Sequence, residues 1–137
     1  VINDVGPRDG LQNQPKILEP DHRVRLVRAL LAAGMDHVEI AAFVSPKAVP
    51  AMAGAAEVVA ALDDIADANL SVLIPNMKGY ELAVEAGARA VGMVLYATDE
   101  MAEANVRMTM AEADAATEVA RKVSGVQRVV KVFEYVD

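Results

Sequence analysis

The sequence of 137 residues contains no cysteine and no tryptophan, and only 4% of its residues are aromatic. The absence of cysteine excludes disulfide bonds, thiolate nucleophiles and cysteine-ligated zinc sites. No stretch approaches the roughly 18 consecutive apolar residues that a membrane-spanning helix needs, and no basic segment precedes a short apolar run as in a secretory signal. We therefore expect a cytoplasmic protein that has no membrane as a partner.

Basic residues are also scarce. The chain has 13 Lys and Arg against 20 Asp and Glu, which gives a formal net charge of −7. A protein that binds nucleic acid through phosphate contacts needs the opposite balance, so we do not expect nucleic acid as a partner. Apolar residues are abundant instead, at 54% of the chain, which is typical of a globular domain with a packed core.

Short apolar runs alternate with amphipathic helical segments along the chain, at about 30 residues per unit. The predicted strands are residues 1–5, 37–40, 70–74, 90–95 and 129–136, and the predicted helices are residues 21–34, 54–66, 78–86 and 109–123. Asp21 and Thr109 are the expected helix caps, Gly34 and Gly87 the expected helix ends, and a polar connection is expected through Asn105. Such an order predicts parallel strands joined by right-handed crossovers.

This α/β pattern suits either an open doubly wound sheet or part of a (β/α)₈ barrel. The Gly-rich turn of dinucleotide-binding folds does not follow the first predicted strand. A long polar loop, residues 6–13, follows it instead and places Arg8 next to Asp9. Active sites of both architectures lie at the carboxyl ends of the strands, so this loop is the first candidate for a functional site.

Adjacent Arg8 and Asp9 combine two kinds of chemistry, because a carboxylate ligates hard cations and a guanidinium stabilises a developing oxyanion. Taken alone, the dipeptide is more typical of an ion pair that braces a surface loop. Glu39 favours the first interpretation. It lies in an otherwise apolar strand, where a charge needs a partner, and in a parallel barrel Arg8 is the available cation.

Three separated blocks of sequence resemble the 3-hydroxy-3-methylglutaryl-CoA lyase family. They are residues 5–13 (VGPRDGLQN), residues 38–50 (VEIAAFVSPKAVP) and residues 74–80 (IPNMKGY). The resemblance covers about residues 1 to 107. It implies the N-terminal half of a metal-dependent TIM barrel, to which the predicted elements contribute about four βα units and a final strand. It also implies an acyl-CoA substrate, 3-hydroxy-3-methylglutaryl-CoA, which is cleaved to acetyl-CoA and acetoacetate.

Each expected site residue follows from that resemblance. Asp9 corresponds to a ligand of the divalent metal, Mg²⁺ or Mn²⁺, and Arg8 to the arginine that stabilises the enolate of the departing acetyl-CoA. Glu39 corresponds to the glutamate that supports the site, and Gln12 to a substrate-binding residue of the same motif. A retro-aldol cleavage needs such a cation facing the nascent enolate.

The sequence departs from the family at some positions. Gln14 replaces the usual Glu, and residues 41–42 are Ala-Ala where small hydroxyl residues usually stand, which bears on substrate preference. The family's His-x-His pair of metal ligands is absent from the chain, and we expect His22 and His37 to be surface or structural residues. We therefore expect a lyase-family fragment that does not turn over substrate by itself.

The last part of the chain gives a different pattern. Residues 108–137 depart from the lyase family and have a short match to the closing helix and strand of a BON domain, so we expect a lyase-like domain over residues 1–107 and a tail of separate origin. The alternative function is a non-catalytic half-barrel or chimera that self-associates through its open strand edges. A homo-oligomer is expected in either case.

Overall fold

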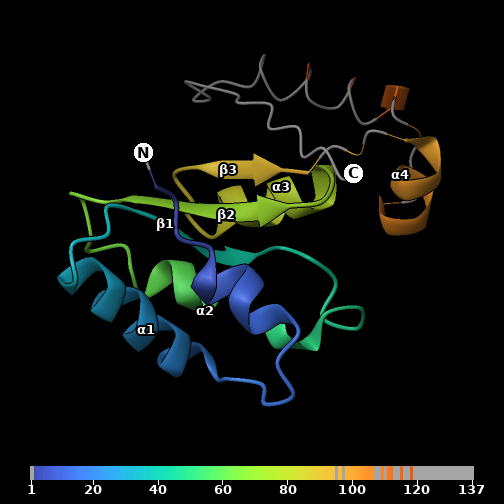
Figure 1. Cartoon of the computed structure of the whole chain (residues 1–137). Helices are drawn as coiled ribbons and strands as arrows, with labels where there is room; N and C mark the ends of the chain where they lie inside the picture. The colour runs from blue at the N-terminus through green and yellow to red at the C-terminus, as the bar shows by residue number, and fades with distance from the viewer. Residues whose placement is uncertain are drawn as a thin grey trace.

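The computed structural model of the chain describes residues 2–94, 96, 98–106, 109, 111, 112, 115 and 118. Helices and strands alternate along most of this range (Figure 1). The elements are a π-helical turn η1 (Gly6–Gly10), α1 (Pro20–Ala32), β1 (His37–Ala42), a 3₁₀ turn η2 (Pro50–Met52), α2 (Ala55–Ala60), β2 (Asn69–Ile74), α3 (Met77–Glu85), β3 (Val91–Met93) and α4 (Asp99–Val106).

The three strands form one parallel sheet in the order β1-β2-β3. The predicted first strand is reduced to a single parallel bridge between Asp4 and Val38, held by hydrogen bonds from the Asp4 N–H to His37 O (2.9 Å) and from the Glu39 N–H to Asp4 O (2.8 Å). The prediction of a full strand over residues 1–5 is therefore wrong for the described residues, because the chain turns into η1 at Gly6. The parallel direction of the pairing is as expected.

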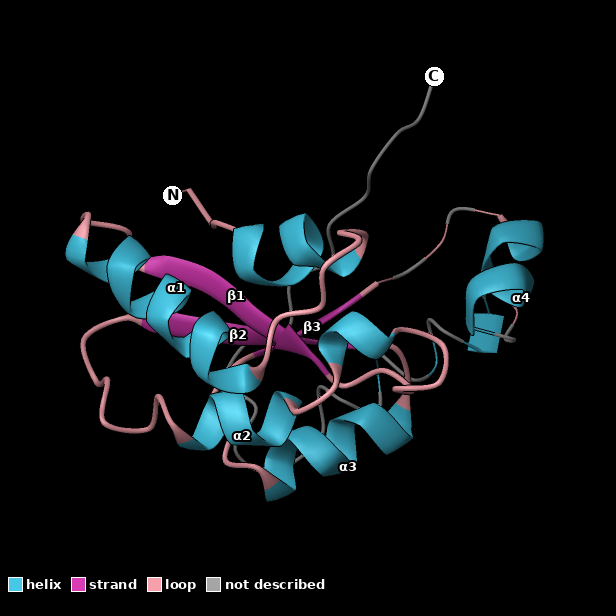
Figure 2. Cartoon of the chain, turned by 90° about the horizontal axis from the view of Figure 1, so that it is seen from below, coloured by secondary structure: helices cyan, strands magenta, loops and turns pink. Residues whose placement is uncertain are grey.

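The two faces of the sheet bury different apolar clusters. The outer face packs against α1, α2 and α3, which Figure 2 shows gathered along one side of the strands while α4 lies apart. Its core comprises Val27, Val38, Ile40, Ala41, Phe43, Ala55, Val58, Val59, Leu62, Val72, Ile74 and Ala83. A smaller cluster, which we call the inner cluster, comprises Ala42, Ala51 and Met52, with Leu11, Val44, Val49 and Leu73 packed against it.

A β-bulge in β1 changes which face of the sheet its side chains point to. The register with β2 shifts between Glu39 and Ala41, so that Ile40 and Ala41 both belong to the outer core. Ala42 belongs to the inner cluster, and because its partner Leu73 lies two residues after Ser71, the partner of Glu39, Ala42 and Glu39 share one face of the sheet. Bulges of this kind redirect side chains and are frequent beside active sites. The sequence prediction ended this strand at residue 40, whereas β1 runs to Ala42.

Helix ends follow the local signals with some corrections. Gly34 (φ +95°) and Gly87 (φ +85°) end α1 and α3 in the left-handed conformation, as predicted. The prediction of Asp21 as the cap of α1 is wrong: Glu19 holds the cap position without a side-chain hydrogen bond, because Pro20 already occupies the first helical position. The helix predicted over residues 54–66 also ends early, since α2 stops at Ala60.

The segment after β3 contains a helix that the sequence did not predict. The expected polar connection through Asn105 is wrong, because α4 occupies Asp99–Val106. Thr109, in contrast, caps the following residues as predicted: its Oγ1 accepts from the Glu112 N–H (3.3 Å) while Glu112 Oε2 accepts from the Thr109 N–H (2.8 Å). Most of the predicted helix over residues 109–123 and the whole predicted strand over residues 129–136 lie outside the described residues.

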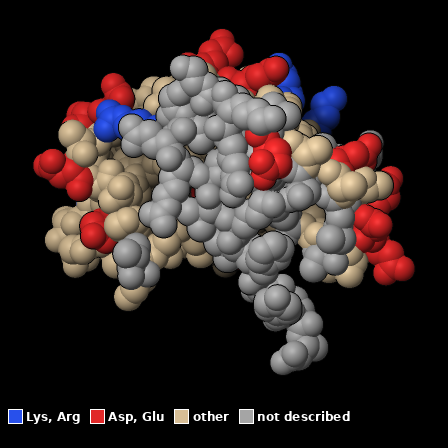
Figure 3. All heavy atoms as spheres, turned by 90° about the horizontal axis from the view of Figure 1, so that it is seen from above, with Lys and Arg blue, Asp and Glu red and all other residues tan. Residues whose placement is uncertain are grey.

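The surface reflects the acidic composition. On the face seen in Figure 3, red acidic side chains lie along the left, upper and right edges, and blue basic ones are few. Within the described part of the chain, no helix has the length and apolar character needed to cross a membrane.

Candidate active site

The turn η1 presents Arg8 and Asp9 to the sheet. Three successive backbone N–H groups, those of Arg8 (3.1 Å), Asp9 (2.7 Å) and Gly10 (3.2 Å), converge on the carbonyl oxygen of Val5. The turn begins at Gly6, whose N–H donates to Asp4 Oδ1 at 2.8 Å. Single π-helical turns are rare and frequently mark functional sites. The GPRDG sequence therefore forms a tight, internally bonded platform rather than an open loop.

Arg8 links the two carboxylates that the sequence singled out. Its Nε donates to Glu39 Oε1 across a separation of 31 residues, and its Nη1 donates to Asp9 Oδ1 at 2.7 Å. Its Nη2 makes no hydrogen bond to the described residues. The contact between Arg8 and Glu39 is as predicted, whereas the ion pair between Arg8 and Asp9 is the alternative that the sequence left open. Hydrogen bonds from two of the three guanidinium nitrogens fix its orientation, and the third nitrogen, Nη2, remains available to an anionic ligand.

Burial distinguishes the members of this group. The side chains of Glu39 and Arg8 are 9% and 15% exposed, whereas that of Asp9 is 59% exposed. Glu39 lies inside β1, which runs to Ala42, two residues past the predicted end of the strand. A carboxylate this deeply buried needs a charged partner, and Arg8 supplies it.

The other predicted site residue stands slightly apart. Gln12 follows η1 and is half-buried, and its side chain makes no hydrogen bond to the residues that the structure describes. Its neighbour Gln14 donates to Gly10 O at 3.1 Å and so closes the loop on itself. The structure therefore places Gln12 beside the group without connecting it to Arg8.

A divalent cation fits this site in one respect. Mg²⁺ commonly takes one or two protein carboxylates and completes its shell with water and substrate oxygens. Asp9 is exposed at the surface of η1, and its carboxylate is a hard oxygen donor that suits this role. Among the described residues, no group of three or more possible ligands is formed. One oxygen of each carboxylate already accepts from Arg8, but only Asp9 is largely exposed, so Asp9 can serve as one ligand of such a cation.

Arg23, which the sequence analysis missed, contacts the segment that contributes Met52 to the inner cluster. Its side chain is fully buried, its Nη1 donates to Ala53 O at 2.8 Å, and its Nη2 lies 3.9 Å from the Met52 sulfur. Its Nε has no hydrogen-bond partner within the described part of the chain. Burial lowers the pKa of this guanidinium, and the Glu57 carboxylate partly offsets the effect. In the sequence, Arg23 is one of three arginines on one helix, and nothing marks it as the buried one.

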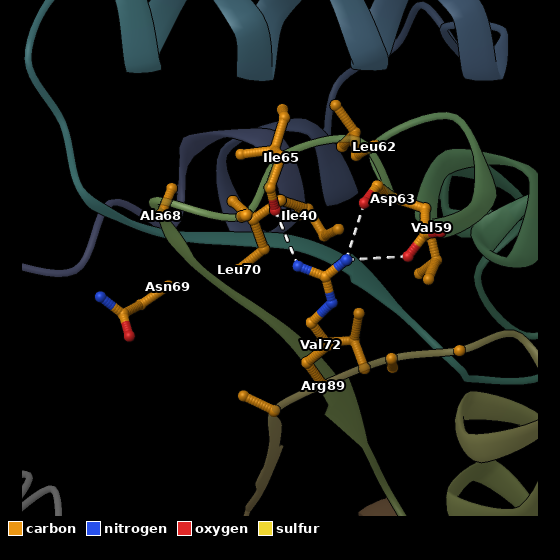
Figure 4. A pocket seen from close by; sticks show the side chains of 14 residues that line it. Ile40, Val59, Leu62, Asp63, Ile65, Ala68, Asn69, Leu70, Val72 and Arg89 are labelled. Carbon is orange, nitrogen blue, oxygen red and sulfur yellow. Dashed lines mark hydrogen bonds and ion pairs between the residues drawn. The ribbon is translucent and has the colours of Figure 1, made fainter.

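A cavity of about 260 Å³ lies elsewhere, at the amino end of β2 and β3. Figure 4 shows Arg89 crossing it, with hydrogen bonds from Nη1 to Ile65 O (2.8 Å) and from Nη2 to Asp63 Oδ1 (2.9 Å). The remaining lining is mostly apolar. Because conserved chemistry in parallel α/β folds sits at the opposite, carboxyl ends of the strands, we assign this cavity a structural rather than a catalytic role.

Comparison with known proteins identifies the family. The sequence model of the HMGL-like family matches residues 1–135. The chain belongs to the HMGL-like family. Its relatives include the (R)-citramalyl-CoA lyase of Chloroflexus aurantiacus, which is 46% identical over 82% of this chain and 38% of the relative. They also include the 3-hydroxy-3-isohexenylglutaryl-CoA/hydroxy-methylglutaryl-CoA lyase of Pseudomonas aeruginosa, which is 42% identical over 78% of this chain and 36% of the relative.

Solved structures of this family share the fold. The hydroxymethylglutaryl-CoA lyase of Pseudomonas aeruginosa superposes with a TM-score of 0.77 at 39% identity, over 88% of this chain and 41% of that chain. An HMG-CoA lyase of Acinetobacter baumannii, in complex with coenzyme A and 3-methylmalate, gives 0.83 at 38% identity, over 91% and 41%. The predicted fold class, part of a (β/α)₈ barrel, is confirmed. The chain spans less than half the length of these HMGL-like relatives.

The family match also bears on the tail. It continues to residue 135 and so includes most of the segment that the sequence analysis assigned to a separate origin. The boundary near residue 107 stays a prediction.

Proposed function

We propose that this chain forms the part of a carbon-carbon lyase that carries the enolate-stabilising arginine. The proposed reaction is the cleavage of 3-hydroxy-3-methylglutaryl-CoA to acetyl-CoA and acetoacetate. The observation that carries the proposal is the pair formed by Arg8 and Glu39, which joins two segments 31 residues apart on the inner face of the sheet. The names of the relatives support an acyl-CoA substrate.

The chemistry assigns a different task to each residue. Removal of the hydroxyl proton lets the neighbouring carbon-carbon bond break, and its electron pair moves onto the thioester as an enolate. The free Nη2 of Arg8 faces that negative charge as it develops, while Glu39 holds the guanidinium in place. Preorganisation of this kind is effective because the buried ion pair cannot reorient during the reaction.

Asp9 and Gln12 complete the proposal. Asp9 binds a divalent cation, Mg²⁺ or Mn²⁺, which when bound polarises the substrate oxygens. Gln12 binds the substrate at the rim of η1. The homo-oligomeric state and the cytoplasmic location also stay predictions, as does the expected lack of turnover by these 137 residues alone.

Steady-state kinetics of the full-length protein test the function. With saturating Mg²⁺, 3-hydroxy-3-methylglutaryl-CoA and citramalyl-CoA are offered separately, since relatives of both kinds are similar to this chain. Arg8→Met should lower kcat by about 100-fold with little change in KM, because its charge matters most when the enolate forms. Asp9→Ala should raise the Mg²⁺ concentration needed for half-maximal activity, and Glu39→Ala should give an intermediate loss of kcat.

Two results would remove the proposal. Absence of cleavage of both thioesters by the full-length protein contradicts the lyase function. Near wild-type turnover by Arg8→Met contradicts the catalytic role and leaves the Arg8–Asp9 pair as a brace of the loop. Arg25→Ala is a suitable control, because Arg25 is exposed on α1 and lies outside the blocks that resemble the lyase family.

The alternative function, self-association through open strand edges, is supported by the position of β3. This strand pairs with β2 on one side and has no neighbour on the other among the described residues. Analytical ultracentrifugation at micromolar concentration tests it, and a stable monomer would contradict the predicted homo-oligomer.

A further inference from the structure

Gly92 occupies the middle of β3, on the inner face of the sheet. It pairs in register with Leu73, which in turn pairs with Ala42, and both of these side chains belong to the inner cluster. Its neighbours Val91 and Met93 pack against the outer core. Because side chains alternate along a strand, a side chain at residue 92 would point to the face that carries Glu39.

The backbone does not require glycine at this position. Gly92 is not among the glycines with positive φ, which are Gly34, Gly54 and Gly87. A Cβ at residue 92 would meet only Glu39 Oε2 among the described residues, at 3.6 Å, an ordinary contact distance. At Gly79, by comparison, a Cβ would lie 2.7 Å from the Phe43 carbonyl oxygen, so there the packing itself excludes a side chain.

A glycine inside a strand lowers stability by about 0.5 to 1 kcal/mol relative to alanine, and it often marks a place where a ligand approaches the backbone. The surroundings of Gly92 show what kind of group fits there. Glu39 Oε1 is bound to Arg8, whereas Oε2, the oxygen that faces Gly92, has no hydrogen-bond partner among the described residues. Leu73, the partner of Gly92 on β2, belongs to the apolar inner cluster, so an apolar side chain lies next to Gly92 on the same face.

We propose that the space over Gly92 receives the substituent on the hydroxyl-bearing carbon of the substrate, so that residue 92 sets the largest substituent that the enzyme accepts. Glu39 Oε2 accepts a hydrogen bond from the hydroxyl, and the alkyl group lies over the bare backbone of β3 against Leu73. This inference rests on the proposed lyase function and names a specificity-determining residue for it.

The test compares substrates that differ only in that substituent. A series of 3-hydroxyglutaryl-CoA thioesters with hydrogen, methyl, ethyl or butyl at carbon 3 is offered to the full-length protein and to Gly92→Ala and Gly92→Val. We expect Gly92→Val to shift the size limit toward smaller groups, lowering kcat/KM for the largest accepted substituent about 10-fold or more relative to hydrogen. Gly92→Ala should lie between Gly92→Val and the wild type.

The design separates the two possible failures. Each variant is judged by the ratio of kcat/KM between two substrates in one preparation, so a reduced fraction of folded protein cancels. Val91→Ile, which adds a methylene to the outer face of the same strand, should leave the ratios unchanged. A wild-type protein that cleaves none of the series overturns the proposed function together with this inference. A wild-type protein that cleaves them, with the same size profile in Gly92→Val, overturns this inference alone.

Discussion

Ion pairs between arginine and a carboxylate occur at both ends of the sheet, but their surroundings differ. At the carboxyl side, Arg8 and Glu39 are 15% and 9% exposed and form a pair on the inner face of the sheet. At the amino side, Arg89 and Asp63 are 54% and 76% exposed, and Arg28 and Asp64 are 45% and 64% exposed. The same chemical groups therefore have different consequences at the two ends.

The difference follows from desolvation. Water screens the exposed pairs, so each contributes little to stability and serves chiefly to tie a loop to a helix or strand. The buried pair has lost its hydration and depends on its partner, so neither charge can be removed alone without a large cost. A fixed, partly desolvated guanidinium is also what a reaction with a developing anion requires. Burial therefore points to the carboxyl side as the functional end.

The largest expected effect comes from breaking the buried pair. Glu39→Ala leaves the Arg8 guanidinium largely buried without its main partner and should lower the free energy of unfolding by about 3 kcal/mol. Urea denaturation of the full-length protein measures it. Glu39→Gln, which keeps the shape and an acceptor oxygen, should lose less. A loss from Glu39→Ala no larger than that from an exposed pair would contradict the comparison.

The second effect concerns close packing at the carboxyl side. Gly79→Ala would place a Cβ 2.7 Å from Phe43 O and 2.8 Å from Pro75 Cδ, which forces α3 away from the sheet. We expect a loss of about 2 kcal/mol, measured by the same denaturation. Gly10→Ala is the matched control, because nothing lies within 4 Å of its Cβ position. Equal stability of the two variants would show that α3 adjusts freely.

A smaller effect is expected at the amino side. Arg89→Met removes the ion pair with Asp63 and the hydrogen bond to Ile65 O but keeps the side-chain length across the cavity. Because both charges are mostly exposed, the free energy of unfolding should fall by less than about 1 kcal/mol. Thermal denaturation checks this value. A loss as large as that from Glu39→Ala would contradict the view that exposed pairs contribute little to stability.

The smallest effect is a change in pH dependence. The hydrogen bonds from Arg28 lower the pKa of Asp64 below its ordinary value of 3.8. The unfolded chain therefore binds this proton more readily than the folded one, so the contribution to stability is present above pH 4 and is lost as the pH falls through the lowered pKa. Asp64→Asn should slightly weaken the dependence of the melting temperature on pH in this acid range. An unchanged pH dependence would contradict the assignment.

Local sequence signals predicted much of the chain. Gly34 and Gly87 end helices because only glycine adopts positive φ at low cost, and this preference is visible in the sequence. The side chain of Asn76, which caps α3 by accepting from the Gly79 N–H at 3.0 Å, was not predicted as a cap, although asparagine is a common residue at that position. The pairing of Arg8 with Glu39 was predicted from a buried charge and the only nearby cation, together with the family resemblance.

Other features depended on contacts that the sequence does not encode locally. The bulge at residues 39–41 arises from the register between β1 and β2, and the burial of Arg23 arises from the packing of α1 against the segment before α2. The sequence also missed α4, because its hydrophobic pattern is weak.

By itself, then, the sequence determined the alternation of most helices and strands, the glycines that end α1 and α3 and the residues proposed for the site, since each depends on backbone preference, on hydrophobic period or on a motif a few residues long. Only the tertiary structure decided which arginine is buried, which carboxylate oxygen stays free and which glycine leaves room beside it. These properties depend on how segments distant in the chain exclude water from one another, and no local pattern in the sequence carries that information.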